Sequence, residues 1–511
     1  MNSVNADNPV AQKWQLKAIV WIIVVLIGGI TRYRARYFMN SDGVSYLDLG
    51  QNLELSPLWS PAYSWLLGFG VWILDPNPLG LYPVAHAVTF LGFLFSLVAL
   101  NLLLKQLEFD FLWFFLAHAV FVWVALVLTP PVHITPDLFL LGFVLLATFL
   151  AFRIVRSNAS PWLLGISIGL GYLFKTPMLP FGLILIAWVA LSGKLSAVRA
   201  FVAVIPFVLL FVIPISIQTG RLTMGDNTRL NYLWHVGGVR EGLLRNEIPE
   251  RIIGREIEII NYGGVSNATY PIWYNPSLWW KKSALDVDCS RTFNKAITRL
   301  KNLVLGSSRV GPFVLLLLPL IGLQLWERRR VEYILLLPLI VMSVLFSIVH
   351  LESRYVAPFV MLAFLATPVR SGVGIIFGIS FLVFALFFSR NIFSTSLDST
   401  LKGKEYESII TSLNDRGVVE SDPIATLEWG NRHQSWAKVY GLKIVGNLYN
   451  LRDAENFAAL EPAKQLSVLS DFNSLGAKAV FSYSCPDYWT KISGTGLCWY
   501  DLRRLSAVTD K

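Results

Sequence analysis

Long apolar runs separated by short polar connections make up most of the first 390 residues. A membrane-spanning helix is built from such a run, because it must cross about 30 Å of hydrocarbon. Runs that suit transmembrane helices lie at 18–31, 81–104, 111–129, 137–155, 161–175, 178–192, 199–219, 310–326, 333–350, 355–369 and 372–389. The pattern predicts about eleven transmembrane helices, with the weakest pattern in the shortest runs.

Two stretches between the first and second runs are more polar and are interrupted by proline. Residues 44–55 and 59–74 are expected to form helices in the membrane interface, where Trp and Tyr concentrate at headgroup level. The aromatic residues concerned are Trp59, Tyr63, Trp65 and Trp72. A longer polar region, 220–309, contains the sequence NATYPIWYNPSLWW. Such a loop suits contacts with a sugar or lipid headgroup, and it suits anchoring in the interface equally well.

The pattern changes after Arg390, where short apolar runs alternate with helical stretches. Strands are expected at 423–428, 443–448 and 478–482, and a helical stretch at 456–473, which indicates a small α/β domain. The predicted division is a membrane domain, 1–390, and an α/β domain, 391–511. None of the three cysteines has metal-ligand spacing, and Cys485 could pair with Cys498 in an oxidising compartment.

The positive charge is concentrated in alternate connections between the apolar runs. The residues concerned are Lys105, Arg153, Arg156, Lys194, Arg199, Arg328, Arg329, Arg330 and Arg370. Because cytoplasmic loops are rich in Lys and Arg, this places the N-terminus inside and 32–80, 220–309 and 391–511 outside. Arg32, Arg34 and Arg36 break the rule; snorkelling explains them, and binding of a lipid phosphate is the alternative.

Composition supports a membrane protein over a nucleic-acid-binding one. The 511 residues are 54% hydrophobic and 15% charged, whereas soluble domains carry about 25% charged residues. The net charge of +10 is accounted for largely by the basic loops. No nucleic-acid partner is expected, and the first run, which has no cleavage site after it, is interpreted as a retained signal anchor.

Six ionisable residues stand at the outer ends of the predicted spans, where burial without a partner costs several kcal/mol. They are Asp42 in SDGVSYLDLG, Asp137 in HITPDLFLLG, Lys175 in GYLFKTPMLP, and His350, Glu352 and Arg354 in VHLESRY. Acids and cations thus reach one surface from different spans, which favours a shared site.

Each of these residues also has a purely structural interpretation. Asp42 would cap a helix beginning at Gly43, and Asp137 would favour the dipole of the helix it starts. Lys175 would snorkel from a helix end. Glu352 and Arg354, close in sequence, would form an ion pair with no part in chemistry.

In layout and in several local sequences the chain resembles the GT-C class of polyprenyl-phosphate-sugar-dependent glycosyltransferases. It is most similar to the bacterial relatives of protein O-mannosyltransferases and to the aminoarabinose transferase of lipid A. The sequences that carry the resemblance are SDGVSYLDL, TPDLFL, YLFKTP, GDNTRLNYLWHVGG, YPIWYNPSLWW and HLESRYVAP. Several relatives have an adjacent acidic pair where this chain has Asp42 followed by Gly43, so any metal requirement is left open.

The resemblance implies a multi-pass α-helical protein with about 11 transmembrane helices and a C-terminal extracytoplasmic domain. It also implies transfer of a hexose or pentose from a polyprenyl-phosphate donor to an acceptor hydroxyl, with inversion. Such chemistry needs a base for the hydroxyl proton and positive charge for the departing phosphate. Asp42 is the expected base, Lys175 and Arg354 the phosphate ligands, His350 a weaker one, and Asp137 a ligand for the acceptor or a cation. The expected substrate-binding set is Asp137, Lys175, His350, Glu352 and Arg354.

The same resemblance implies that the protein lies in the bacterial inner membrane, with its site facing the periplasm or exterior. The expected partners are the lipid-linked donor, a protein, lipid or glycan acceptor, and membrane lipids. No nucleotide cofactor is expected, and a divalent cation is left open.

Two further functions are compatible with the sequence. A transporter or flippase of lipid-linked glycans would favour inverted repeats and charges near the membrane midplane, and no repeat is found. A non-catalytic scaffold would require Asp42, Lys175 and Arg354 to lie far apart.

Overall fold

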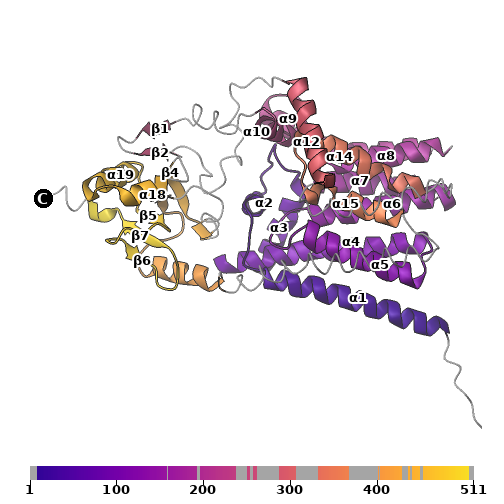
Figure 1. Ribbon diagram of the computed structural model, residues 1–511, viewed down its shortest axis with the longest axis horizontal. Coiled ribbons are helices and arrows are strands. Elements are labelled where there is room, and N and C mark those ends of the chain that lie inside the picture. Colours follow the sequence, from indigo (N-terminus) through magenta and orange to yellow (C-terminus); the bar gives the residue numbers. More distant parts are fainter. Residues whose placement is uncertain are drawn as a thin grey trace, which may run out of the picture.

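The computed structural model describes most of the chain. The described residues are 9–157, 159–192, 196–237, 250–253, 257–261, 287–305, 332–366, 401, 403–427, 436–437, 440–448 and 453–505. They form a helical bundle and a mixed β-sheet, which lie at opposite ends of the molecule (Figure 1).

The long helices of the bundle follow the apolar runs. They are α1 (Pro9–Arg34), α4 (Leu81–Gln106), α5 (Phe111–Trp123, continued as a π-helix over Val124–Leu128), α6 (Asp137–Ser157), α7 (Pro161–Phe174), α8 (Met178–Leu191), α9 (Ser196–Thr219), α14 (Leu337–Val349) and α15 (Ser353–Leu365). Among the described helices, five are long and apolar enough to cross a membrane: α1, α4, α5 with its π-helix, α6 and α9. The chain is therefore built as a multi-pass membrane protein. The runs at 310–326 and 372–389 lie outside the described residues, so the count of eleven stays a prediction.

Local sequence sets where several of these helices begin and how closely they pack. Asp110 caps α5, its side chain accepting a hydrogen bond of 2.9 Å from the amide of Trp113. Proline occupies the first position of α7, where its missing N–H costs nothing. A side chain at Gly165 of α7 would overlap the backbone of Ala200 in α9, so this glycine permits the close approach of the two helices.

Two shorter helices follow α1, as expected, and much of their surface is buried. Helix α2 (Ser41–Gln51) is buried from Gly43 to Gly50, and it crosses α3 (Pro61–Leu74) where Gly50 and Gly68 touch backbone to backbone. Tyr63, expected at the headgroups, is fully buried, and its hydroxyl lies 2.7 Å from that of Thr89. Helix α2 and Tyr63 are therefore covered by other parts of the protein, and the expected position of these helices in the membrane interface stays a prediction.

The β-sheet has seven strands in the order β1-β2-β4-β3-β5-β7-β6. Its centre is parallel: β3 (Pro423–Thr426) pairs with β4 (Lys443–Leu448) and with β5 (Ala479–Ser482). Helices α18 (Asp453–Ala459) and α19 (Pro462–Ser474) lie in the β4–β5 connection. Strands β7 (Cys498–Asp501) and β6 (Thr490–Lys491) complete one edge in antiparallel pairing. The three central strands stand where the sequence predicted them.

The other edge of the sheet comes from the polar region 220–309. Strand β2 (Glu258–Asn261) pairs with β4, and β1 (Glu250–Ile253) pairs with β2. The sheet therefore extends beyond the predicted domain of 391–511. The same region also supplies α10 (Asn227–His235) and α12 (Cys289–Leu305), whereas the sequence NATYPIWYNPSLWW lies outside the described residues.

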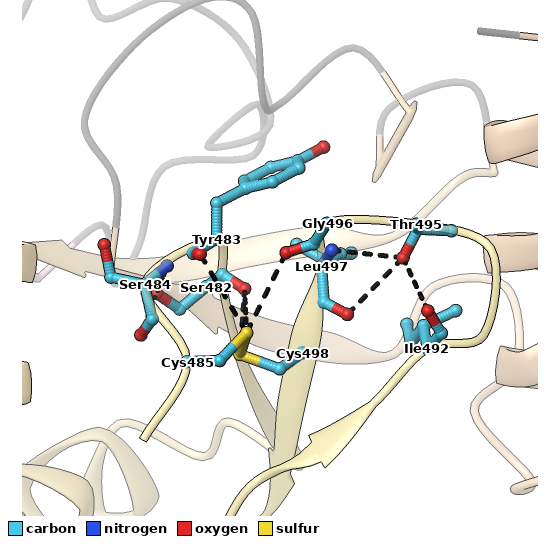
Figure 2. Close-up of a disulfide and its surroundings, with 9 residues drawn as sticks. All are labelled: Ser482, Tyr483, Ser484, Cys485, Ile492, Thr495, Gly496, Leu497 and Cys498. Atoms are coloured by element: carbon cyan, nitrogen blue, oxygen red, sulfur yellow. Dashed lines mark hydrogen bonds between the residues drawn. A yellow bond between two sulfur atoms is a disulfide. The ribbon is translucent and has the colours of Figure 1, made fainter. Parts of the chain in front are cut away.

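The predicted pairing of Cys485 with Cys498 is confirmed. The disulfide joins the loop after β5 to the start of β7, with Cα atoms 5.7 Å apart (Figure 2). Beside it, the amide of Leu497 donates to the hydroxyl of Thr495 at 3.0 Å, which closes the turn before β7. The sheet end also contacts the bundle, since the rings of Tyr82 in α4 and Tyr406 stack at 5.3 Å.

Candidate active site

The six ionisable residues singled out in the sequence form one connected network at helix termini. Their positions are the first turn of α2 for Asp42, the start of α6 for Asp137, the residue after α7 for Lys175, the residue after α14 for His350, the residue before α15 for Glu352, and the first turn of α15 for Arg354. Consecutive antiparallel helices bring the end of α7 and the start of α6 to one end of the bundle. The end of α14 and the start of α15 meet there for the same reason.

Arg354 is the centre of the network. Its Nε donates to Glu352 Oε2 at 2.5 Å, and both Nη atoms lie 3.4 Å from Asp42 Oδ2. Its Nη1 is also 3.8 Å from Asp137 Oδ2. One guanidinium therefore touches three carboxylates from α2, α6 and α15, which the fork geometry of arginine allows.

Asp137 is the most buried acid of the group, with 1% of its side chain exposed. Lys175 Nζ donates to one of its oxygens, and the hydroxyl of Thr135 donates to the other at 2.7 Å. A buried carboxylate is stable only when it is paired and hydrogen-bonded. Asp137 thus does more than favour its helix dipole: it fixes Lys175 and Arg354 side by side.

On the far side of Arg354, histidines continue the network. His350 Nε2 lies 2.7 Å from Glu352 Oε1, so both oxygens of Glu352 are engaged. The imidazole of His350 stacks on that of His235, at the end of α10, with ring centroids 3.8 Å apart and planes 7° from parallel. Glu352 with Arg354 is an ion pair, as the structural interpretation held, but it is part of the larger network.

Tyr355 is a site residue that sequence reasoning missed. Its ring lies under both cations, 4.5 Å from Lys175 Nζ and 5.1 Å from the guanidinium carbon of Arg354. Cations are attracted to the face of an aromatic ring at such distances. Its position directly after Arg354 in the sequence ESRY was the feature that could have indicated its place in the site.

The start of α2 is locked onto the turn that precedes Asp137. Asn40 occupies the cap position of α2, and its side-chain oxygen accepts a 2.9 Å hydrogen bond from the amide of Ile134. A side chain at Gly43 would overlap Ile134, so the glycine permits this approach. Because the helix begins at Ser41, Asp42 is not its capping residue, and that interpretation was wrong. Asn40 instead sets the position of Asp42 relative to Asp137.

Arg32 also holds this turn. It is buried at the end of α1, and its Nη1 donates to the carbonyls of Pro131 at 2.6 Å and His133 at 3.3 Å. The snorkelling interpretation was therefore wrong for Arg32. Arg36 lies instead over the ring of Tyr33, at 4.1 Å.

The arrangement joins proton acceptors with anion-binding groups. Three carboxylates surround Arg354 and Lys175, and two of them remain partly exposed, Asp42 at 26% and Glu352 at 35%. Within the part of the chain that the structure describes, no group of three or more His, Cys, Asp or Glu residues is placed to hold a metal ion. Since Asp42, Lys175 and Arg354 meet in one network, the condition for a mere scaffold is not met.

Comparison with known proteins shows the fold. No protein-family model matches the sequence, and no curated protein matches it. Crystal structures of ArnT from Cupriavidus metallidurans are similar over nearly the whole chain. The apo structure has a TM-score of 0.53 and 12% identity, with 94% of this chain and 98% of that chain covered. The structure bound to undecaprenyl phosphate has the same TM-score and identity, with 97% and 98% covered. The chain therefore has an ArnT-like fold, as its layout led us to expect.

Proposed function

We propose that the protein is a membrane glycosyltransferase that moves a hexose or pentose from a polyprenyl-phosphate donor to an acceptor hydroxyl. The observation that carries this proposal is the contact of a partly exposed carboxylate, Asp42, with Arg354, which Asp137 holds beside Lys175 at one end of an ArnT-like bundle. The placement of these charges at an end, rather than at mid-bundle, favours transfer over transport.

Asp42 is the carboxylate best suited to act as the base. Glu352 is held at 2.5 Å by Arg354 and at 2.7 Å by His350, and Asp137 is buried and accepts hydrogen bonds from Lys175 and Thr135. By contrast, the contacts of Asp42 with the described side chains are long, 3.4 Å to Arg354, and Asp42 is partly exposed. A hydroxyl can therefore approach Asp42 without breaking a short hydrogen bond, and proton transfer to it fits general-base catalysis.

Lys175 and Arg354 are suited to receive the leaving phosphate. The donor phosphodiester carries one negative charge, and the phosphate monoester that leaves carries up to two. Groups that meet charge developed in the transition state lower the barrier most. Asp137 and the ring of Tyr355 hold Lys175 and Arg354 in place before the substrate binds, so the two cations need little reorganisation during the reaction.

In the proposed step the acceptor oxygen forms a bond to the anomeric carbon while the bond from that carbon to the phosphate oxygen breaks. The bonding electrons leave with the polyprenyl phosphate, and the hydroxyl proton goes to Asp42. Attack opposite the leaving group inverts the anomeric configuration. In this proposal the protein lies in the bacterial inner membrane, with the site facing the periplasm or exterior.

The test uses purified protein in lipid nanodiscs with radiolabelled polyprenyl-phosphate pentoses and hexoses. Release of polyprenyl phosphate with transfer of the labelled sugar is expected for at least one donor. Arg354→Gln should lower that rate by about 10²- to 10³-fold, while the control Arg503→Gln, two residues after β7, should not change it. Uptake of an intact donor into vesicles, without cleavage of any donor, would show a transporter instead.

A further inference from the structure

Helix α12 (Cys289–Leu305) has an unusual charge distribution. Its sequence, CSRTFNKAITRLKNLVL, contains four basic residues and no acidic one. The helix lies against α14 (Figure 1). None of the residues discussed so far as catalytic or substrate-binding belongs to it.

One face of α12 is attached to the site end of the bundle. Arg299 donates to the carbonyl of Ser347 at 2.8 Å and to that of His235 at 2.9 Å. The hydroxyls of Thr292 and Tyr232 lie 2.9 Å apart, and Leu303 is buried. Ser347 stands one turn before His350, so these contacts fix the level of α12 close to the candidate active site.

The bundle covers only part of the apolar surface of α12. Phe293 and Ile297, four residues apart and hence on one side of the helix, are 65% and 49% exposed. Leu305 at the end of the helix is exposed as well. An exposed apolar stripe on an otherwise basic helix is typical of a helix lying in the headgroup region of a bilayer.

The basic residues of α12 are available to a ligand. Lys295 and Lys301 are exposed, and neither forms a salt bridge within the described residues. The guanidinium of Arg291 donates to the carbonyl of Gly237 at 3.2 Å, and its backbone amide donates to the side chain of Asp288, which precedes the helix. No acid lies within α12 itself, so positive charge predominates on its exposed surface.

We infer that α12 is a binding surface for anionic phospholipids, with Phe293 and Ile297 inserted among the acyl chains and Lys295 and Lys301 on the lipid phosphates. Charge complementarity and the exposed apolar stripe together favour a lipid surface. A soluble acidic partner would pair with the lysines but would leave Phe293 and Ile297 exposed to water. The same helix holds the ends of α10 and α14 through Arg299, so lipid bound here supports the stacked His235 and His350. This inference rests on membrane insertion and not on the proposed reaction.

The depth of α12 is measured first. Because Cys485 and Cys498 are bonded, Cys289 is the one thiol to remove, and Cys289→Ser with Phe293→Cys accepts a single nitroxide label. In nanodiscs the label should collide more with oxygen, which concentrates in the membrane, than with a water-soluble nickel chelate. The reverse order would show that Phe293 faces water and would overturn the inference.

Lipid selectivity is measured next, by native mass spectrometry of the detergent-purified protein titrated with phosphatidylglycerol or phosphatidylcholine. A basic residue near an anionic surface contributes about 1 kcal/mol, so Lys295→Gln with Lys301→Gln should weaken the phosphatidylglycerol affinity by about 25-fold. The control, Lys464→Gln in α19 with Lys491→Gln in β6, should leave it unchanged. Equal affinity for the two lipids, or an unchanged affinity in the α12 variant, would contradict the inference.

Discussion

The ion pair of Asp137 with Lys175 gives a quantitative prediction about stability. Asp137→Asn removes the single carboxylate that pairs with Lys175 among the described residues, while Arg354 keeps Glu352 and Asp42. Loss of one partner of a buried pair costs about 3–5 kcal/mol. Because 17% of the Lys175 side chain is exposed and water can reach it, we expect the lower end, about 3 kcal/mol.

The measurement is unfolding by sodium dodecyl sulfate in mixed micelles, followed by tryptophan fluorescence. Lys175→Met in the Asp137→Asn background removes the unpaired ammonium, and it should restore about 2 kcal/mol of the loss, which the double-mutant cycle reports as coupling. Asp501→Asn, which breaks an exposed pair with Arg503, is the control and should cost at most about 1 kcal/mol. A cost below about 1 kcal/mol for Asp137→Asn, with no coupling to Lys175, would refute the view that the pair is buried and mutually dependent.

Three further predictions concern positioning, the disulfide and topology. Asn40→Ala removes the hydrogen bond that holds the turn before Asp137, so it should misplace the base and lower turnover about 10- to 100-fold. The control, Asn52→Ala at the other end of α2, should leave turnover unchanged. Equal rates for the two variants would contradict the positioning role of Asn40. Replacing Cys485 and Cys498 by serine should cost about 3 kcal/mol in the same unfolding assay, and finding both thiols free in unreduced wild-type peptides would end this prediction. A cysteine introduced at Arg329 should resist impermeant reagents in intact cells, and its labelling would reverse the predicted orientation.

The bundle and the centre of the sheet could be predicted because both follow from local pattern. A long apolar run in a membrane must form a helix, because its backbone N–H and C=O groups can then pair within the segment. The strands around Ile424, Ile444 and Val480 are short apolar runs bounded by turns. Strands β1 and β2 could not be predicted, since each has four residues and only the pairing of β2 with β4, far along the chain, joins them to the sheet. The burial of Arg32 escaped prediction because its partners, the carbonyls of Pro131 and His133, are backbone atoms.

The same distinction applies to the candidate site. Asp42, Asp137 and Arg354 stood out because charged groups at span ends are costly without partners. Asn40 and His235 are ordinary polar residues in sequence, and only the three-dimensional contacts with Ile134 and His350 reveal their position in the network. The catalytic assignment of Asp42 remains a prediction.

The most direct test of that assignment is the turnover of Asp42→Asn with a lipid-linked donor that the wild type uses. The substitution keeps the size of the side chain and removes the basic carboxylate. As a first-turn acid, Asp42 contributes only about 0.3–1 kcal/mol to its helix, so the variant should fold and still bind the donor. We expect its rate of sugar transfer to fall by about 10²- to 10⁴-fold. Wild-type turnover by Asp42→Asn would contradict the account.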